Sequence, residues 1–344
     1  MKAFLVDRYG HRDELRLAEI PDPVPQEDEV LVQIHAASVN PLDSKIKHGD
    51  FKHVLPHRPP FILGHDLAGV VVGVGAAVTR YRPGDEVYAR PATDRVGTFA
   101  ELIAVNERDL AAKPATLTMA EAASLPLVAL TAWQALVERG KLQPGQKVLI
   151  HAGSGGVGTI AIQLAKHLGA EVATTASATN AGWLTELGAD LVIDYKTQDF
   201  AALLHDYDLV LDTQGGATLD RSLRILKPGG LIVGIAGPPD PHFARQINAG
   251  LPLKLATRVL SLRTRLKARR CGVRYSFLFM TANGDQLTEI ADLVDKGAIR
   301  PVLDQTFPFG QTNEAMAYVE GGRAKGKVVI TVDSGRVSQS GEEG

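Results

Sequence analysis

Three glycines at a characteristic spacing mark the segment of this chain where the sequence most clearly indicates chemistry. Gly153, Gly155 and Gly158 form a GxGxxG pattern between an apolar run at 148–150, typical of a buried strand, and residues 157–168, whose apolar positions predict a helix. Such glycines permit a tight turn and let a pyrophosphate approach the backbone, and the helix N-terminus offers N–H groups to the phosphates. A glycine-rich turn without a ligand is the alternative. We predict a dinucleotide site formed by Gly153, Ser154, Gly155, Gly156, Val157 and Gly158.

The end of the next predicted strand indicates which dinucleotide is preferred. Sites for NAD usually place an Asp or Glu there to bind the ribose hydroxyls. Here the strand ends at Ser177, and no acidic residue lies between Glu171 and Glu186. Tyr195, after the third predicted strand, supplies a further hydroxyl. These features leave room for a 2′-phosphate and favour NADPH, whereas a plain strand end with a surface tyrosine is the alternative.

Composition places the chain among ordinary globular proteins. Its 344 residues are 45% apolar and 22% charged, and its net charge of −2 predicts no general attraction to nucleic acid. A single cysteine, Cys271, excludes an internal disulfide and a metal site made of several cysteines. The N-terminus shows no signal-peptide pattern, and Glu121, Pro126 and Gln134 interrupt the apolar stretch 119–137. We therefore expect a reducing, cytoplasmic location.

The predicted elements fall into two regions of different character. Short strand-like runs separated by Pro- and Gly-rich turns predict a partly closed antiparallel barrel over the first 120 residues. From about residue 140, strands alternate with helical segments, as in a doubly wound parallel sheet. The runs in the first region are 2–7, 29–38, 66–75, 85–89 and 98–105, and the strands in the second are 147–152, 171–176, 191–194, 208–212, 231–236 and 276–280.

The last part of the chain is expected to return to the first region. A helical stretch follows Gly284 and a final strand is predicted over 327–332. We predict a first domain from residues 1–122 and 283–333 and an NADP(H)-binding domain from residues 123–282. The polar tail 334–344 is predicted to be disordered.

In the order of its motifs the chain resembles the medium-chain dehydrogenase/reductase superfamily, and within it the zinc-independent quinone oxidoreductases and alkenal/enone reductases. The resemblance covers residues 1–333 and implies a fold of class α/β, with a GroES-like β-rich catalytic domain, a Rossmann-type parallel sheet and an active site in the cleft between them. It rests on ASVNPLDSKIKHGD (37–50), ILGHDLAGVVVGVG (62–75), RPGDEVYA (82–89), GTFAELIAV (97–105), ASLPLVALTAWQAL (123–136), HAGSGGVG (151–158), LDTQGG (211–216) and KPGGLIVGIAG (227–237).

Comparison with the zinc enzymes of the superfamily predicts that no metal is bound. Those enzymes hold catalytic zinc with cysteine, histidine and a further cysteine or carboxylate. Here His65 and Asp66 remain, Asn40 stands near the place of the first cysteine, and no cysteine precedes Cys271. One histidine with one carboxylate is too few for a tetrahedral zinc site and is more often a structural hydrogen-bonding pair.

A reductase without a Lewis acid is suited to conjugated acceptors, because hydride addition to an enone or quinone gives a delocalised anion. The resemblance implies catalytic roles for Asn40 and Asp43, which match the family's N-x-x-D motif, although both could instead cap a helix near Pro41. Lys45 stands where many quinone reductases have tyrosine and resembles the alkenal/enone reductase branch. It would orient the substrate oxygen or donate a proton, and a solvated helix lysine is the alternative.

Further residues are assigned to the cofactor by the same resemblance. Thr131 matches a residue near the nicotinamide, and Lys327 matches a lysine found near the cofactor. Asn180 replaces the family's lysine for the 2′-phosphate, which is a departure from the pattern. Ala236 and Phe279, in the last two predicted strands, complete the set of cofactor-binding candidates.

The segment 251–274 stands apart because it carries eight Lys and Arg residues and no acid. Its leucines recur at near-helical spacing, which suggests a basic amphipathic helix pair. Attachment to a membrane surface or binding of an anionic partner is one hypothesis. A solvated flap that packs through its leucine face is the alternative, which we prefer on sequence grounds.

The leading functional hypothesis is an NADPH-dependent reductase of quinones or α,β-unsaturated carbonyls that acts on a small-molecule substrate. An enoyl-thioester reductase, or an NADPH-binding sensor or scaffold with weak catalysis, are the alternatives. No nucleic-acid partner is expected. A homodimer is predicted because the last strand of the parallel sheet, SFLFM, would otherwise leave an exposed apolar edge.

Overall fold

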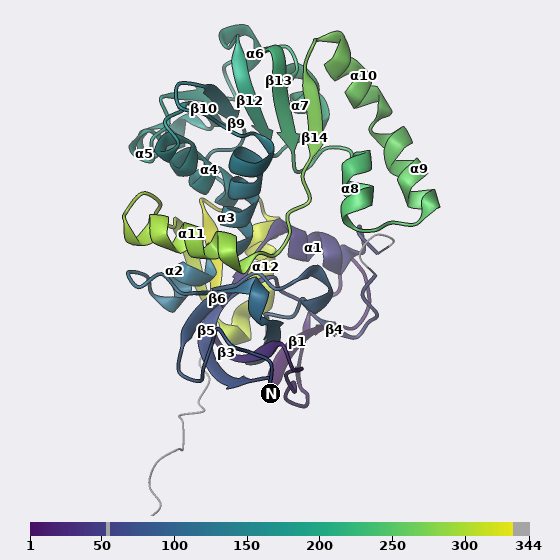
Figure 1. Cartoon of the computed structure of the whole chain (residues 1–344), viewed down its shortest axis with the longest axis vertical. Helices are drawn as coiled ribbons and strands as arrows, with labels where there is room; N and C mark the ends of the chain where they lie inside the picture. Colours follow the sequence, from purple (N-terminus) through teal and green to yellow (C-terminus); the bar gives the residue numbers. More distant parts are fainter. Residues whose placement is uncertain (53–55, 333–344) are drawn as a thin grey trace, which may run out of the picture. The chain divides into compact units, whose positions relative to one another are not determined.

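The computed structural model describes residues 1–52 and 56–332, and the tail predicted to be disordered, 334–344, lies outside them. The chain divides into two compact units (Figure 1). Unit 1 contains residues 1–127, 281–296 and the chain from 301 onward, and unit 2 contains residues 128–280 and 297–300.

Unit 2 is built on a six-stranded parallel sheet with the order β11-β10-β9-β12-β13-β14. This is the strand order of a complete dinucleotide-binding sheet, in which the chain starts at the centre and winds outward in both directions. The α/β fold class predicted from the sequence is therefore confirmed. The strands are β9 (Lys147–Ile150), β10 (Glu171–Ala176), β11 (Leu191–Asp194), β12 (Tyr207–Asp212), β13 (Leu226–Gly234) and β14 (Arg274–Phe277).

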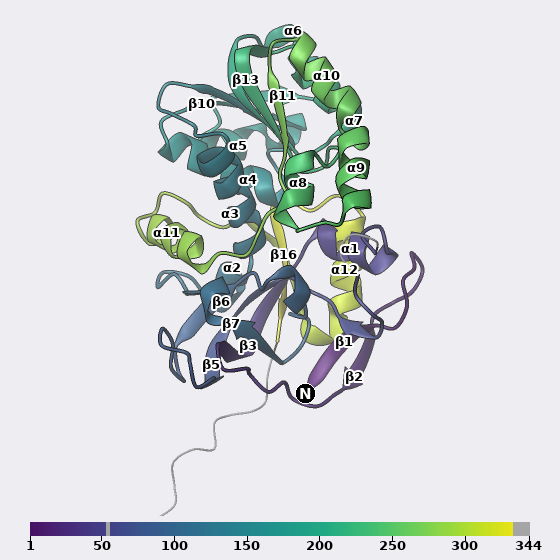
Figure 2. The ribbon, with the colours of Figure 1, turned by 45° about the vertical axis from the view of Figure 1, so that its right-hand side comes forward.

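Helices accompany every step of this sheet (Figure 2). The helix α3 (Pro126–Trp133) leads from unit 1 into unit 2 and continues as a π-helical turn, Gln134–Arg139. The others are α4 (Gly156–His167), α5 (Ala181–Glu186), α6 (Phe200–Leu203), α7 (Gly216–Ser222), α8 (Pro241–Gln246), α9 (Leu251–Leu260) and α10 (Leu262–Arg270), with a 3-10 turn at Ala178–Asn180.

Apolar strands explain why the sheet forms at this place in the chain. Leu149, Val210 and Ile232 are fully buried in one core cluster, as expected for parallel strands that are covered on both faces. The predicted sixth strand, 276–280, is displaced: β14 begins at Arg274 and ends at Phe277. Leu278 and Met280 are buried after the strand has ended, so these two apolar side chains of the predicted edge are covered within the chain itself.

Unit 1 contains a seven-stranded sheet with the order β15-β16-β3-β5-β6-β8, in which β7 also pairs with β3, and a three-stranded sheet, β2-β1-β4. All pairings are antiparallel except β15 with β16. The strands are β1 (Lys2–Val6), β2 (Arg16–Glu19), β3 (Glu29–Val39), β4 (Phe61–Ile62), β5 (Asp66–Val74), β6 (Glu86–Ala89), β7 (Leu102–Asn106), β8 (Leu110–Ala112), β15 (Leu303–Pro308) and β16 (Lys327–Thr331).

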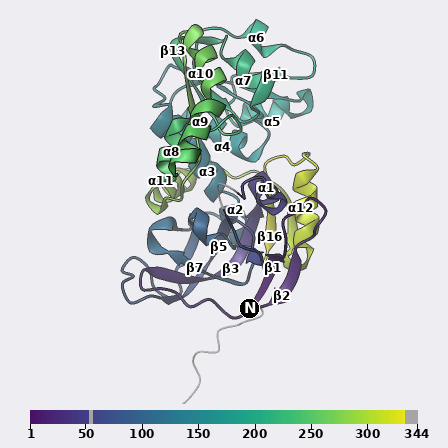
Figure 3. The ribbon, with the colours of Figure 1, turned by 90° about the vertical axis from the view of Figure 1, so that its right-hand side faces the viewer.

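Four helices of the described residues belong to unit 1; α12 lies against β16 (Figure 3) and also contacts β15. They are α1 (Pro41–His48), α2 (Met119–Ala123), α11 (Gly284–Asp295) and α12 (Thr312–Glu320), with 3-10 turns at Thr93–Arg95, Glu107–Asp109 and Phe309–Gln311. The predicted strand 98–105 starts only at Leu102, because Phe99 instead exchanges backbone hydrogen bonds with Leu63 and Phe4. No helix of the described residues is long and apolar enough to cross a membrane.

A buried histidine at the end of β9 makes the stability of unit 2 depend on pH. His151 is hydrogen-bonded to the hydroxyls of Thr175 (3.1 Å) and Ser222 (2.8 Å) and packs edge-on against Phe200. Burial, with a smaller effect from the charge of Arg221, lowers the pKa of His151 to about 4. The unfolded chain therefore binds a proton at a higher pH than the folded protein does, and stability falls as the pH drops below the ordinary pKa of histidine.

We expect this one group to remove roughly 3 kcal/mol of unfolding free energy between about pH 7 and about pH 4. His151→Gln removes the titration and keeps a hydrogen-bonding side chain, so its unfolding free energy should fall less over the same range. Denaturant unfolding at several pH values measures the difference. His205→Gln is the control, because His205 is exposed. Parallel pH profiles for wild type and His151→Gln would contradict the assignment.

Candidate functional site

The glycine loop between β9 and α4 is held in a strained conformation. Ala152 has a φ of +53°, in the left-handed region that non-glycine residues seldom adopt. Its N–H donates to the hydroxyl of Thr175 (3.2 Å), and the N–H of Gly153 donates to the Thr175 carbonyl (3.0 Å). The neighbouring strand thus fixes the entry into the loop. Strain of this kind persists where the surrounding structure sets the backbone, and it often accompanies a binding site.

The three glycines of the motif serve different purposes. A Cβ on Gly153 would lie 2.1 Å from the Thr174 hydroxyl, and one on Gly158 would lie 2.4 Å from the carbonyl oxygen of Ala152. These two glycines are therefore required by the packing of the loop itself. A Cβ on Gly155 would meet only the Ala152 oxygen, at 3.4 Å. The fold leaves space at Gly155, so its lack of a side chain keeps open the approach to the N-terminus of α4.

This loop fits the phosphates of a dinucleotide. Gly155 precedes α4, whose first turn presents the amides of Gly156, Val157 and Gly158, and a helix cannot satisfy its first N–H groups internally. The next strand, β10, ends at Ala176 and is followed by the hydroxyls of Ser177 and Thr179, 3.0 Å apart. The loop therefore offers hydrogen-bond donors for a pyrophosphate, and the end of β10 offers hydroxyls where an acid would repel a 2′-phosphate.

The remaining cofactor candidates of unit 2 follow the ends of neighbouring strands. Tyr195 comes after β11 and donates its N–H to the Ala176 carbonyl (3.2 Å), which places it beside the end of β10, with its side chain exposed. Ala236 follows β13 and is exposed, and Phe279 follows β14 and packs edge-on against Phe243. Thr131 is buried in α3. The carboxyl ends of parallel strands meet at one edge of a sheet, where ligands of such folds bind.

Lys327 belongs to unit 1, where it lies in a buried polar cluster with Asn40. Its Nζ donates to the Asn40 Oδ1 (2.6 Å) and lies 3.3 Å from the Asp66 Oδ2. The Asn40 Nδ2 donates to the same Asp66 oxygen (2.8 Å), as does the hydroxyl of Ser38 (2.6 Å). Asn40, Asp66 and Lys327 are all nearly inaccessible to solvent. The three side chains thus hold one another, and both ends of the Asn40 amide have fixed partners.

A second pair adjoins this cluster at the start of α1. The Asp43 carboxylate accepts a hydrogen bond from the Asn40 N–H (2.7 Å) and faces the His65 Nδ1 at 2.6 Å. Since the carboxylate can only accept, the Nδ1 carries the proton. The His65 Nε2 is buried, with no hydrogen-bond partner among the described residues. Asp43 therefore caps α1 and orients His65, so the helix-capping alternative is realised by Asp43, whereas the Asn40 amide is held by Lys327 and Asp66.

The third residue assigned to catalysis is placed differently. Lys45 is exposed on α1, whereas Asp43 and Ser44 of the same helix are buried. The structure brings Asn40, Asp43 and Lys327 together but does not bring Lys45 into their cluster. Sequence reasoning missed Ser38 and Asp66 as partners of Asn40. The pairing of β3 with β5 and β16 makes that neighbourhood, and no local pattern reveals it.

No group of three or more His, Cys, Asp or Glu side chains within residues 1–52 and 56–332 is arranged to hold a metal ion. Of the two residues retained from the zinc motif, His65 pairs with Asp43, and Asp66 pairs with Asn40, Ser38 and Lys327. The prediction that His65 forms a structural hydrogen-bonding pair thus agrees with the geometry, although its partner is Asp43.

Comparison with known proteins defines the class. Residues 26–115 match the alcohol dehydrogenase GroES-like domain, and residues 187–330 match the model described as zinc-binding dehydrogenase. The chain is 39% identical to the mitochondrial NAD(P)H oxidoreductase RTN4IP1 of Homo sapiens, over 96% of this chain and 89% of that protein. It is 36% identical to the chloroplastic NADPH-dependent alkenal/one oxidoreductase of Arabidopsis thaliana, over 96% and 79%. The solved quinone oxidoreductase of Coxiella burnetii matches with a TM-score of 0.85 at 32% identity, covering 96% of this chain and 99% of that one.

The fold and the glycine loop are those of a two-domain, nucleotide-dependent oxidoreductase. The chain belongs to the medium-chain dehydrogenase/reductase superfamily, in the group of quinone oxidoreductases and alkenal/enone reductases, as the resemblance implied. It is an NADPH-dependent oxidoreductase.

The location predicted from the sequence is wrong. The first relatives are mitochondrial or chloroplastic by name, which contradicts a cytoplasmic protein. The physical reason is that a low cysteine count reports on the redox environment and not on the compartment, and different reducing compartments leave the same composition.

The first prediction of this site concerns Gly155. Gly155→Val should fold, because the fold leaves space there, but should lower NADPH affinity by about 10- to 150-fold by blocking charge-assisted hydrogen bonds to the pyrophosphate. Equilibrium titration monitored by nucleotide fluorescence measures this. Gly310→Val is the control, since nothing lies within 4 Å of its Cβ position. Unchanged affinity in folded Gly155→Val would remove the loop from the binding site.

The second prediction concerns the buried cation. Lys327→Met leaves the Asp66 carboxylate buried without its cation and should lower the unfolding free energy by about 3–5 kcal/mol. Adding Asp66→Asn should recover a large part of this loss, because the uncompensated charge is gone. Denaturant unfolding of the single and double variants gives the coupling energy, with exposed Lys296→Met as the control. Additive losses would mean that Lys327 and Asp66 do not depend on each other.

Proposed function

We propose that the substrates of this reductase are α,β-unsaturated carbonyls and quinones. The observation that carries the proposal is the position of Asn40. A zinc ligand of the superfamily's alcohol dehydrogenases is replaced here by an amide that Lys327 and Asp66 hold at 2.6 and 2.8 Å. With this buried amide in place of a zinc ligand, the site suits a substrate whose product anion is delocalised, because such an anion needs alignment more than a Lewis acid. The names of the Arabidopsis and Coxiella relatives support the same substrate classes.

In this proposal the residues of the chain bind the cofactor and align the substrate with it. The amides of Gly156, Val157 and Gly158 bind the pyrophosphate of NADPH, and bound NADPH supplies the hydride. Ser177 and Tyr195 border the 2′-phosphate. Reduction of an enone forms a C–H bond at the β-carbon from the hydride, shifts the π electrons to the carbonyl oxygen and ends with a proton from solvent water on the α-carbon. Lys45, which is exposed on α1, is the proposed partner of that oxygen.

The proposal predicts a pattern of substrates. But-3-en-2-one and 1,4-benzoquinone should oxidise NADPH in the presence of the enzyme, whereas butanone, the saturated control, should not. Activity should persist after prolonged chelation, because the sequence lacks the cysteine ligands of the zinc enzymes. Spectrophotometric assay of NADPH oxidation tests this. Tight NADPH binding without turnover of either acceptor would instead favour a sensor, and loss of activity that zinc restores would reveal a missed metal site.

The same assay separates the two roles left open for Lys45. Lys45→Met should slow enone reduction by about 10- to 150-fold if one charge-assisted hydrogen bond to the enolate is lost. Quinone reduction should change less, since the hydroquinone anion is already delocalised. Lys296→Met, another exposed lysine of unit 1, is the control. Equal small effects on both substrates would mean that Lys45 is a solvated helix lysine with no part in the reduction.

We also propose that the protein is a homodimer. Among the described residues β14 is the last strand in the order of its sheet and pairs only with β13, so a second copy can extend the sheet at its outer edge, where the Phe277 N–H already donates to the Asp240 Oδ2 (3.1 Å). The support is the free strand edge, because Leu278 and Met280 are already buried. Light scattering at micromolar concentration measures the oligomeric state.

A further inference from the structure

Helices α9 and α10 of unit 2 present an apolar row outward. Figures 1 and 2 show the two helices following one another along the outside of the parallel-sheet unit. The residues of the two helices that are fully buried are small: Thr257, Ser261 and Ala268. The large apolar residues recur at helical spacing on the opposite side, and all are exposed: Leu251 (71%), Leu255, Val259 (71%), Leu262 and Leu266. The leucine face therefore does not pack on the unit, and the alternative of a flap held by its leucines is wrong.

Positive charge surrounds this row. Segment 251–274 holds eight basic residues without an acid, although the whole chain has a net charge of −2. Within the described part of the chain, only Lys267 of these eight forms an ion pair, with Asp220. The others are left to interact with solvent or with an external anion. Exposed leucines between unpaired cations are the pattern of a helix that lies in a membrane interface.

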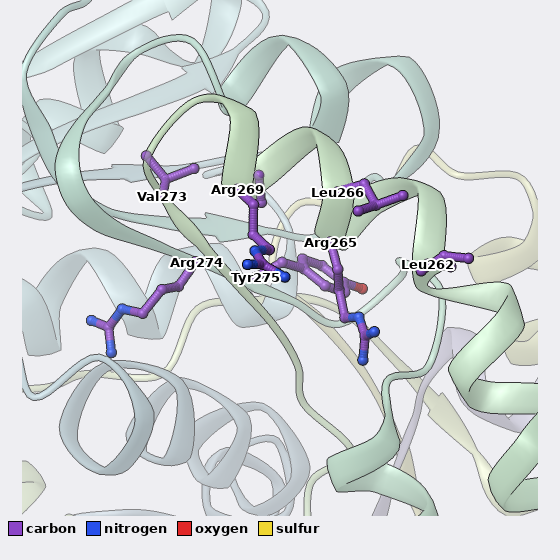
Figure 4. A pocket seen from close by; sticks show the side chains of 8 residues that line it. Leu262, Arg265, Leu266, Arg269, Val273, Arg274 and Tyr275 are labelled. Atoms are coloured by element: carbon purple, nitrogen blue, oxygen red, sulfur yellow. The ribbon is translucent and has the colours of Figure 1, made fainter.

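Two hollows along the helices place charge beside the apolar row. One, of about 690 Å³, is lined by Arg245, Lys254, Arg258 and Arg265 together with Leu251 and Leu255, and also by Asp240, whose carboxylate accepts hydrogen bonds from backbone N–H groups of its own unit. The other, of about 310 Å³, is lined by Leu262, Leu266, Arg265, Arg269 and Tyr275. Figure 4 shows Arg265 and Arg269 extending from α10 beside Tyr275 of β14, with Leu262 and Leu266 farther along the helix. The Nε of Arg265 is buried, with no hydrogen-bond partner among the described residues.

We propose that α9 and α10 dock on the surface of a membrane that contains anionic phospholipids. The leucine row enters the boundary between head groups and acyl chains, and the arginines and lysines of the two hollows bind the lipid phosphates. Charge decides against a second copy of this chain as the occupant. A twofold contact through this face would bring two acid-free basic segments together, and like charges repel. This surface is independent of the proposed substrates, and its test does not measure catalysis.

Vesicle cosedimentation of the full chain tests the proposal. Vesicles of phosphatidylcholine with about one-third phosphatidylglycerol should sediment the protein, whereas pure phosphatidylcholine should not, and high salt should release it. Lys254→Gln/Arg258→Gln should lower the partition coefficient about 25-fold, since each cation near the surface contributes about fivefold. Leu255→Gln/Val259→Gln should lower it about tenfold or more. Leu203→Gln/Arg224→Gln, on an exposed leucine and arginine of other elements, is the control and should bind like wild type.

Several results would overturn the proposal. They are the absence of sedimentation with anionic vesicles, equal binding to neutral vesicles, and unchanged binding of both paired variants. A free anion would be the ligand of the hollows if inorganic phosphate released the protein from the vesicles and chloride at the same ionic strength did not. A smaller particle in light scattering for Leu255→Gln/Val259→Gln would make the face a contact between copies. Circular dichroism confirms that each variant is folded before its binding is compared.

Discussion

The interaction on which unit 1 most depends is the buried contact of Lys327 with Asn40 and Asp66. It joins the last strand of the chain, β16, to the end of β3 and the start of β5, across 287 and 261 residues of sequence. An unpaired charge at this depth costs several kcal/mol, so the three groups are stable only together. The same contact thus fixes both the pairing of β16 at the end of β3 and the orientation of the Asn40 amide. A candidate catalytic residue is held by the same contact that completes the fold.

Unit 2 obeys a different constraint, which is the close packing of neighbouring atoms against the backbone of its glycine loop. Gly153 and Gly158 are dictated by neighbouring atoms of the protein, whereas Gly155 is dictated by nothing in the fold. The three glycines look equivalent in the sequence, but they have different roles. Two of them are required by packing, and the third leaves space for a ligand. The strained Ala152 beside them, tied to Thr175, keeps the loop in place before any ligand arrives.

The sequence was most informative where chemistry and fold depend on local spacing. The six parallel strands and the glycine loop follow from apolar runs and turn residues, and they were predicted within a few residues. β14 was misplaced because a run such as SFLFM does not show which of its residues pair and which are buried after the strand has ended. The partners of Asn40 were missed because they depend on strand pairing over long separations. Lys45 could not be separated from Asp43 by motif alone, since both stand on one helix and only the fold buries one and exposes the other.

Helices α9 and α10 show why periodicity alone does not assign the face of a helix. A row of leucines at steps of three and four predicts a helix with an apolar side, and the usual inference is that this side meets the core. Here the core side is taken by Thr257, Ser261 and Ala268, whose small size lets the helices lie close to the unit. Once the small residues fill that side, the leucines must face outward, and the basic residues between them are available to an external anion. The small residues that form this inward row also recur at helical spacing in the sequence. A second periodic pattern opposite the first is therefore the signal that distinguishes a helix packed by its leucines from one that offers them to a partner.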